Sequence, residues 1–490
     1  MAFLIIFITL LSLIPSLKIP YVVDDVSFLC SLSSAQDEGH VLKWFFAAHN
    51  EHIMTFLKIF YYLFYNFFWL NAAPFHIVVL LNVAGICTLI YLLIKDLTGS
   101  KLTALFGLSL YAASQLCNAA FFVISESHIS FSLSLLLLIF YSQLKFSQNG
   151  FKKWQITALI SSLCAGSVVT LGLGSILFAF LFEKLCLTKE SIKKHGSILK
   201  YILIGWIIAT IPYFFAANKI AHADHYEHIG AKSVFDIIRV TETVKQLFLY
   251  FTFDFIPLFL PWKSVSVALF ILAVIILIAQ RKQINFRQLI FFAFFGIFIT
   301  SLVYLFRVAF GVINLSYSRY DLYPTLMLSI LYAIIFTPII KKIDLTNKIY
   351  SIVFSVILIA LVGYGGFLRY HHANLAALQT HDHIQKFYDE FEESITHYLD
   401  QKSPDQKLAL WNRYMEFPKA DSLKTKKGRD LDLSRGRYQL DLFAGYILPR
   451  KIRARIIWGE KTDPEFLMYL TGFFGQEKYK LIYVLLKNPR

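Results

Sequence analysis

Two adjacent carboxylates lie near the N-terminus, where the segment 21–28 reads YVVDDVSF. Asp24 and Asp25 follow a charge-free run at 1–17, so they lie close to the end of an apolar segment. Two like charges this close repel each other, and the pair therefore tends to share a proton or to recruit a cation. One interpretation is a general base that removes the proton of a hydroxyl group. The alternative is a helix end that carries two solvated acids.

A second group of polar residues lies farther along, in the segment 44–54, which reads WFFAAHNEHIM. His49 and His52 are three residues apart and would share one face of a helix, with Glu51 beside them. This spacing suits a metal ion or the positioning of a substrate. For a His pair in isolation, plain hydrogen bonding is the alternative.

A third group lies in the segment 222–228, which reads HADHYEH. Carboxylates and imidazoles at this density could bind a divalent cation such as Mg²⁺ or Mn²⁺. A merely polar loop is the alternative. The candidate metal ligands are Asp24, Asp25, His222, Asp224 and His225.

A late segment, 307–324, reads RVAFGVINLSYSRYDLYP and carries two arginines beside apolar runs. A cation retained there needs an anionic partner, which could be a lipid headgroup, Asp321 or a bound phosphate. We expect Arg319, with Arg307, to bind phosphate. Tyr320 either contributes to that site or belongs to the aromatic belt of a membrane interface.

Glu126 and His128 lie at the short loop 125–127 between two apolar runs. We expect them to face the same compartment as the acidic pair and to join its site. The alternative is that Ser125 and Glu126 cap the following helix.

The composition limits what kind of protein can carry these residues. Of 490 residues, 57% are hydrophobic and only 16% are charged, against roughly 25% charged in a soluble domain. This composition predicts an integral membrane protein. The net charge of +15 (47 basic minus 32 acidic residues) indicates membrane orientation rather than nucleic-acid binding, and the five cysteines suggest no disulfide framework.

Long stretches without Asp, Glu, Lys or Arg mark the expected membrane spans, since a helix needs about 20 apolar residues to cross a bilayer. These runs are 1–17, 72–94, 102–125, 128–144, 154–182, 201–218, 264–280, 288–306, 322–340 and 349–368. The run 154–182 is too long for one helix, and we divide it near Gly172. The expected fold is therefore an all-α polytopic membrane protein with about eleven transmembrane helices.

The distribution of basic residues predicts the orientation of these spans. With the N-terminus in the cytoplasm, one set of short loops collects the lysines and arginines, as the positive-inside rule requires. Those residues are Lys95, Lys101, Lys145, Lys152, Lys153, Lys184, Lys189, Lys193, Lys194, Lys200, Arg281, Lys282, Arg287, Lys341, Lys342 and Lys348. The opposite side receives the loops 18–71, 125–127, 219–263 and 307–321. The apolar stretch 246–262 is interrupted by Asp254, Pro257 and Pro261, and we expect it to be re-entrant or interfacial.

The chain divides into two expected domains at this point. Residues 1–368 form the transmembrane domain, whose external loop 18–71 contains juxtamembrane helices. Residues 369–490 regain the charge density of a soluble domain and read as a small extracytoplasmic α/β domain.

Taken together, these motifs resemble the GT-C superfamily of polytopic glycosyltransferases, which use sugars carried on polyprenyl phosphates. The family's acidic pair in the first external loop is matched by Asp24 and Asp25, and its His-x-Glu-His segment by residues 49–52. Its late Arg…Gly…Ser-Arg-Tyr stretch corresponds to Arg307, Gly311, Ser318, Arg319 and Tyr320. Position 53 is Ile where the family pattern has Arg. The resemblance extends to about residue 368.

The resemblance implies inverting sugar transfer from a polyprenyl-phosphate-sugar donor. Asp25 or Asp24 would take the proton of an acceptor hydroxyl, and cationic groups would stabilise the departing polyprenyl phosphate. The residues it implies for substrate or phosphate binding are Arg319, Arg307, Tyr320, His49, Glu51, His52, Glu126 and His128. The acceptor would be a cell-envelope glycan, lipid or protein at the outer face of a bacterial inner (plasma) membrane. Some members place a divalent ion on the acidic pair and others do not, so Mg²⁺ or Mn²⁺ stays open.

Three other functions remain open. A glycan polymerase or ligase could use the loop 219–263. A transporter or lipid flippase could have the same number of spans, and an envelope scaffold could use the external tail. Transporters keep charged residues on spans near the bilayer midplane, whereas the predicted spans here contain none. The pattern therefore favours chemistry at one membrane face.

Overall fold

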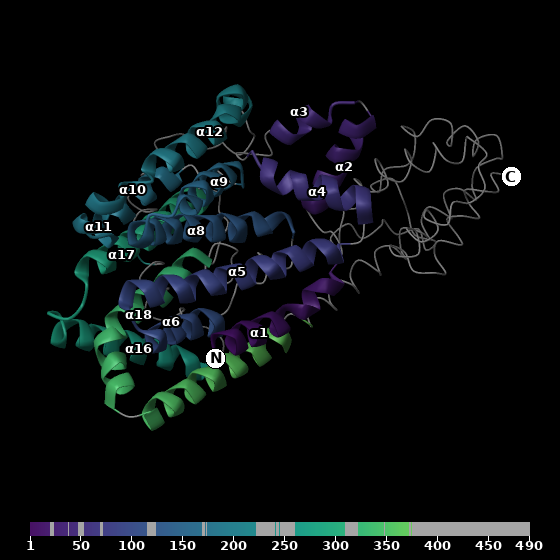
Figure 1. The fold of residues 1–490 in the computed structure, drawn as a ribbon. Coiled ribbons are helices and arrows are strands. Elements are labelled where there is room, and N and C mark those ends of the chain that lie inside the picture. The colour runs from purple at the N-terminus through teal and green to yellow at the C-terminus, as the bar shows by residue number, and fades with distance from the viewer. Residues whose placement is uncertain are drawn as a thin grey trace, which may run out of the picture.

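A computed structural model describes residues 1–19, 24–37, 39–47, 53–68, 72–114, 124–168, 172, 174–221, 241, 245, 260–308, 322–346, 348–371 and 374. Every regular element within these ranges is a helix (Figure 1). The predicted all-helical character of the membrane region is therefore confirmed. The predicted α/β domain lies outside the described residues, except for its first few positions.

The helices follow one another with short connections. They are α1 (Ala2–Leu13), the 3-10 helix η1 (Ile14–Lys18), α2 (Asp24–Asp37), α3 (Val41–Phe46), α4 (Thr55–Phe68), α5 (Ala73–Thr98), α6 (Lys101–Ala113), the 3-10 helix η2 (Ser125–Ser127), α8 (His128–Asn149), α9 (Lys152–Val168), α10 (Ser175–Cys186), α11 (Lys189–His195), α12 (Leu199–Ala221), α16 (Leu260–Ala279), α17 (Phe286–Val308) and α18 (Leu322–Thr346). A final helix, Lys348–His371, follows α18.

Four of the described helices are long and apolar enough to cross a membrane, which indicates a membrane protein. They are Ala73–Thr98, Ser125–Asn149, Leu322–Asp344 and Lys348–His371. A fifth span results if Lys189–His195 and Leu199–Tyr213, which meet at a bend of 79°, are taken together. The described residues thus do not support the predicted count of eleven.

The count differs because a charge-free run is not the same as a helix of equal length. The run 102–125 contains α6, whose 13 residues extend only about 20 Å at 1.5 Å per residue. The described apolar parts of α1, α16 and α17 are also shorter than a full span. Composition therefore located the helices but overestimated how far several of them extend.

The predicted division of the run 154–182 agrees with the structure. α9 ends at Val168 and α10 begins at Ser175. A Cβ atom on Gly172 would collide with the backbone of Ala165. Only glycine can therefore occupy this position between the two helices.

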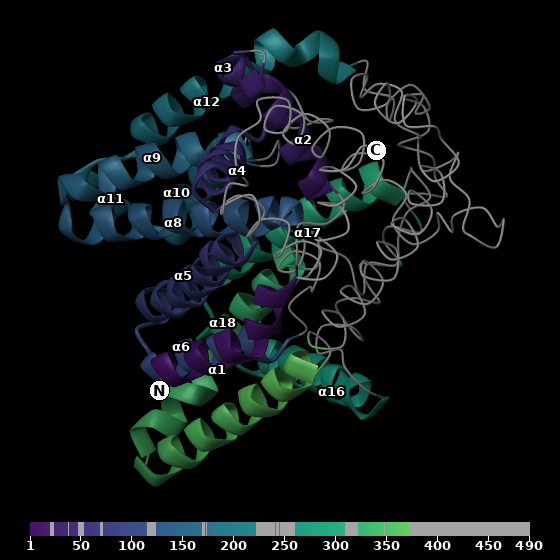
Figure 2. The same ribbon diagram turned by 90° about the vertical axis from the view of Figure 1, so that its right-hand side faces the viewer.

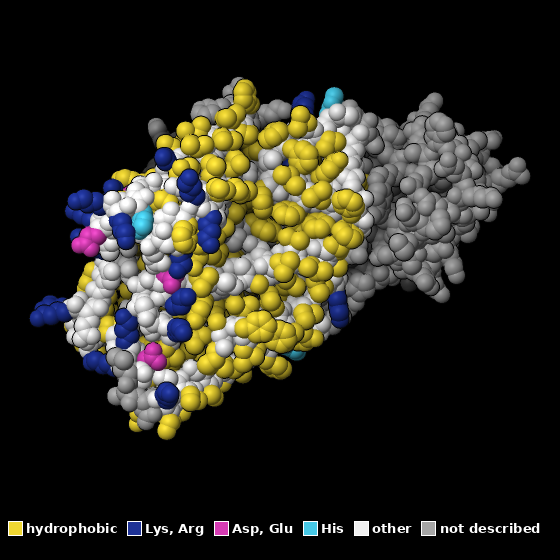
Figure 3. All heavy atoms as spheres, in the orientation of Figure 1, with side chains coloured by type: hydrophobic (Ala, Val, Ile, Leu, Met, Phe, Trp, Pro, Cys, Tyr) yellow, Lys and Arg dark blue, Asp and Glu magenta, His cyan; other side chains and the backbone are white. Residues whose placement is uncertain are grey.

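The helices pack into a bundle with two main groups. α5 lies against α6 and α8, while α9 lies between α8 and α12. α18 joins α6 to α17, and Phe140 of α8 stacks at 5.0 Å on Phe182 of α10 and contacts Phe291 of α17 edge-on at 5.3 Å. Hydrophobic side chains also cover the side of the bundle in Figure 3, as expected of a surface that faces lipid.

The two ends of the bundle differ in charge. Lys and Arg side chains gather at the end where α11 lies (Figure 3). The tight connections at this end use Gly99 and Gly150, whose φ values are 69° and 68°. α2, α3 and α4 lie at the opposite end (Figure 1). The predicted basic loops thus gather at one end.

The boundary predicted at residue 368 falls inside a helix. The final helix continues to His371 and lies beside α1 in both views (Figures 1 and 2). Arg369, which the sequence assigned to the external tail, is 2% exposed within this helix. The apolar run ended at residue 368 only because Arg369 is charged, and the helix does not stop there.

Candidate functional site

Asp25 lies in the first turn of α2, and its side chain is fully buried. Its Oδ1 atom accepts a hydrogen bond from the Tyr61 hydroxyl at 2.7 Å. The same oxygen accepts a second hydrogen bond, from the backbone N–H of Ser125 at 2.5 Å. The carboxylate thus joins α2 to α4 and to the start of η2. Two donors on one oxygen fix the orientation of the group, because each restricts the rotation of the side chain.

Tyr61 is positioned by aromatic packing. Its ring stacks on Phe28 of α2, with ring centroids 5.0 Å apart, and meets Phe75 of α5 edge-on, also at 5.0 Å. Rings in such contacts have little freedom to turn. The hydroxyl is therefore held in place toward Asp25.

The segment that meets Asp25 begins the helical stretch Ser125–Asn149. The N-terminus of a helix carries partial positive charge and unpaired N–H groups, so a carboxylate is stabilised there. Glu126 and His128 are both 8% exposed, and His128 Nδ1 lies 2.6 Å from the Ser125 carbonyl oxygen. The structure thus gathers Asp25, Glu126 and His128 around Ser125.

The capping alternative for this segment is not what the structure has. The N-cap residue of α8 is Ser127, and its side chain makes no capping hydrogen bond. The Ser125 hydroxyl makes no hydrogen bond either. Ser125 contributes its backbone N–H to Asp25, so the polar contact at this helix start comes from a distant acid.

His76 and Lys58 are buried polar residues that the sequence analysis did not single out. His76 lies in the first turn of α5, with its Nε2 atom 3.0 Å from the Ile19 carbonyl oxygen. Lys58 on α4 is 2% exposed, and its Nζ donates to the carbonyls of Trp44 at 2.8 Å and Ala47 at 2.6 Å. Burial lowers the pKa of Lys58 from 10.5 to about 7.

A signal for these residues exists in the sequence. Lys58 interrupts the aromatic stretch TFLKIFYYLFYNFF, and His76 follows the start of an apolar run. A polar group inside apolar sequence is costly to bury unless it is hydrogen-bonded. Tyr61 gives no such signal, because several aromatic neighbours surround it in the sequence.

Several predicted site residues cannot be placed. The side chains of Asp24 and Arg307 lie outside the description, although their backbones belong to α2 and α17. The residues outside the described ranges are His49, Glu51, His52, His222, Asp224, His225, Arg319 and Tyr320. Convergence of Asp24, Asp25, Glu51 and Arg319 on one cavity therefore stays a prediction.

The described residues include no group of three His, Cys, Asp or Glu side chains that could hold a metal ion. What they do include is a buried carboxylate of fixed orientation with an acid and an imidazole nearby. Such a set can accept a proton from a hydroxyl group and can hydrogen-bond a polar substrate.

Comparison with known proteins adds no assignment: no family model, curated protein or solved structure matches this chain.

Proposed function

We propose that this protein is a membrane glycosyltransferase that transfers a sugar from a polyprenyl-phosphate donor to a hydroxyl of a cell-envelope glycan, lipid or protein. The observation that carries the proposal is Asp25, a fully buried carboxylate held by Tyr61 and the Ser125 N–H at the end of the bundle away from the lysines. The motif resemblance described above supplies the reaction class.

In this reaction Asp25 is the general base. An acceptor hydroxyl is a poor nucleophile, and loss of its proton to Asp25 as it attacks the anomeric carbon makes it a better one. The bond from the anomeric carbon to the phosphate oxygen breaks, and the configuration at that carbon inverts. Arg319 and Arg307 stabilise the negative charge on the departing polyprenyl phosphate.

Glu126 and His128 are placed beside Ser125, and we assign them to hydrogen bonds with hydroxyl groups of the sugar or acceptor. Because Asp25 is fully buried, the proposal requires that substrate binding opens this end of the bundle. No step is assigned to a metal ion.

The proposal includes the orientation of the chain. The basic end faces the cytoplasm of a bacterial cell, as the positive-inside rule favours. The end with α2–α4 and the segment from residue 372 face outward. The shorter apolar helices also enter the bilayer, which gives the eleven segments expected from the sequence.

The main test uses purified full-length protein in nanodiscs. Undecaprenyl-phosphate donors with different radiolabelled sugars are added with an envelope extract as acceptor, and the release of free polyprenyl phosphate is measured. We expect release with at least one donor. Asp25→Asn should reduce the rate by about 10²–10⁴-fold, the usual range for loss of a general base. Release from no donor would reject the proposed activity.

Asp25→Asn separates catalysis from structure because the amide oxygen can still accept from Tyr61 and Ser125. Its melting temperature should therefore stay near that of the unmodified protein. The matched control is Glu183→Gln, which neutralises another buried carboxylate, on α10, where Ser197 donates to Glu183 Oε2 at 2.5 Å. The control should retain activity. An active enzyme that tolerates Asp25→Asn would eliminate Asp25 as the base.

A transporter is the second candidate, and Arg369 is the observation that favours it. This buried cation lies on a helix that can cross the membrane, and such residues often mark substrate pathways. Protein reconstituted in vesicles with labelled polyprenyl-phosphate lipids would distinguish the two. Movement of intact lipid between leaflets, without cleavage, supports the transporter.

A further inference from the structure

Arg369 is a buried cation with unused hydrogen-bonding capacity. Its guanidinium Nη2 donates to the carbonyl oxygen of Ala112 on α6. Its Nε and Nη1 atoms are also buried, and neither has a hydrogen-bond partner in the described part of the chain. A guanidinium offers five N–H donors in a planar fork. One carbonyl therefore leaves most of them unsatisfied.

The position of Arg369 follows from a close approach of two helices. A Cβ on Gly365 would lie 2.8 Å from the Ala113 carbonyl oxygen, so glycine lets the final helix lie directly against the end of α6. Arg369 is four residues later and lies on the same face of its helix. It thus reaches the last carbonyls of α6, which have no partner within that helix.

A second unused donor lies beside this guanidinium. Tyr111, also in the last turn of α6, is fully buried, and its hydroxyl has no hydrogen-bond partner within the described ranges. Its side chain is close enough to Arg369 to interact with it electrostatically. A helix cap explains one nitrogen of Arg369 and explains neither the remaining nitrogens nor the Tyr111 hydroxyl.

The chemistry of these groups selects an anion. Arg369 can only donate hydrogen bonds, and a tyrosine hydroxyl can donate as well. Leaving such groups buried and unpaired is unfavourable. A phosphate group has several acceptor oxygens and pairs with the guanidinium fork through parallel hydrogen bonds.

The depth of the site indicates where the phosphate comes from. Arg369 is two residues before the end of the candidate span Lys348–His371, a distance of about 3 Å along the helix axis. This is close to the level at which lipid headgroups meet the hydrocarbon region.

We propose that Arg369 and Tyr111 bind the phosphate group of a lipid headgroup at the end of α6. The site is separate from Asp25 and does not depend on the proposed glycosyl transfer. Inorganic phosphate is the other source of the same chemistry.

The test measures binding to purified full-length protein in detergent. Phosphatidic acid, inorganic phosphate and diacylglycerol, which lacks phosphate, are titrated separately, and the apparent melting temperature is followed. Phosphatidic acid should raise the melting temperature, whereas diacylglycerol should not. A response to inorganic phosphate alone would overturn the lipid source. No response to either phosphate compound would overturn the site.

Tyr111→Phe is the decisive variant, because the hydroxyl it removes has no protein partner. The melting temperature without ligand should not fall, and the apparent Kd for phosphatidic acid should rise about tenfold, which corresponds to about 1.4 kcal/mol. Arg369→Gln should abolish binding but also disturbs the end of α6. Ser175→Ala on α10 removes another buried hydroxyl without a partner and should leave Kd unchanged. An unchanged Kd in Tyr111→Phe would show that Arg369 only caps α6.

Discussion

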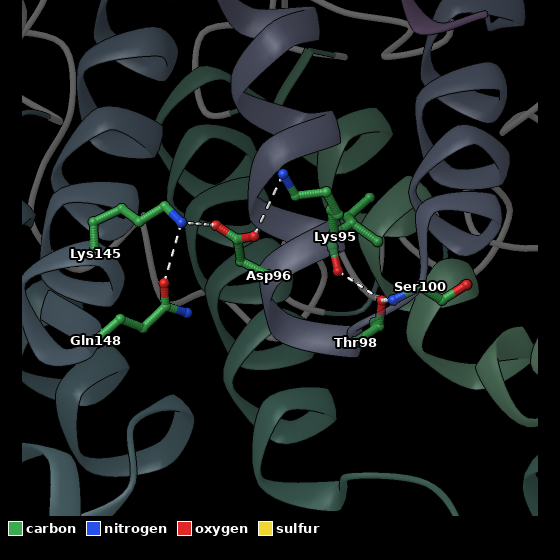
Figure 4. Close-up of polar contacts among 7 residues, drawn as sticks. Lys95, Asp96, Thr98, Ser100, Lys145 and Gln148 are labelled. Carbon is green, nitrogen blue, oxygen red and sulfur yellow. Dashed lines mark hydrogen bonds and ion pairs between the residues drawn. The ribbon is translucent and has the colours of Figure 1, made fainter.

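The two ends of the bundle hold their charged side chains in opposite ways. At the α11 end, Lys145 pairs with Asp96 at 2.6 Å and also bonds Gln148, while Lys95 lies 3.7 Å from Asp96 (Figure 4). These lysines remain partly exposed. At the other end Asp25 and Lys58 are buried and bonded largely to backbone groups.

The difference separates charges that serve orientation from charges that serve a site. Exposed ion pairs gain little because water solvates both partners well. Buried charges lose that solvation and persist only where the surrounding structure hydrogen-bonds them. A membrane protein can place lysines at one face at low cost. The buried end has a specific structure that sidedness alone does not require.

The largest expected effect comes from Asp25→Ala, which removes the acceptor shared by Tyr61 and Ser125. Each buried donor left without a partner costs about 1–3 kcal/mol, so the free energy of unfolding should fall by about 3 kcal/mol. Denaturation in detergent mixtures, followed by circular dichroism, measures this change.

Asp25→Asn should lose much less stability in the same measurement, because its amide oxygen replaces the acceptor. Equal losses in the two variants would mean that the negative charge, and not the pair of hydrogen bonds, stabilises this end.

A smaller effect is expected from the titration of Lys58. Its pKa is lowered to about 7 in the folded protein from 10.5, so above pH 7 the folded state binds fewer protons than the unfolded state. Stability should therefore rise from about pH 7 toward pH 10, with a slope of up to about 1.4 kcal/mol per pH unit. Below pH 7 both states are protonated, and this contribution becomes constant.

Lys58→Met should flatten that slope, as followed by the apparent melting temperature across the pH range. The matched control is Lys43→Met on the neighbouring helix α3, at a position that is exposed. If both variants keep the slope of the unmodified protein, Lys58 is not its source.

The smallest effect is expected at the basic end. Asp96→Asn weakens the contact with Lys145, and we expect a loss below about 1 kcal/mol that shrinks further at high salt. Thermal melts at low and high ionic strength measure it. A loss as large as that of Asp25→Ala would remove the contrast between the two ends.

The sequence predicted where helices form, but not everything about their ends. Charge-free runs coincide with helices because burial in lipid requires both apolar side chains and satisfied backbone groups. The same runs could not show that α6 stops at Ala113, since the cause is a tertiary contact with Arg369.

The candidate site was predictable only in part. Asp25 was identified by its acidic neighbour, and Glu126 and His128 by their place in a short loop. Tyr61 and the Ser125 N–H were not, because one is an aromatic residue among many and the other is a backbone group that any residue supplies. Their contacts join positions 36 and 100 residues apart, a relation that local patterns do not contain.

The contact between Arg369 and Ala112 has a consequence for how the chain is made. The two residues are 257 positions apart, so the ribosome completes α6 long before it synthesises the arginine. Until then, the carbonyls at the end of α6 must be hydrated or bound by an insertion factor. The first helices therefore reach their final arrangement late in translation, when the last membrane segment leaves the translocon.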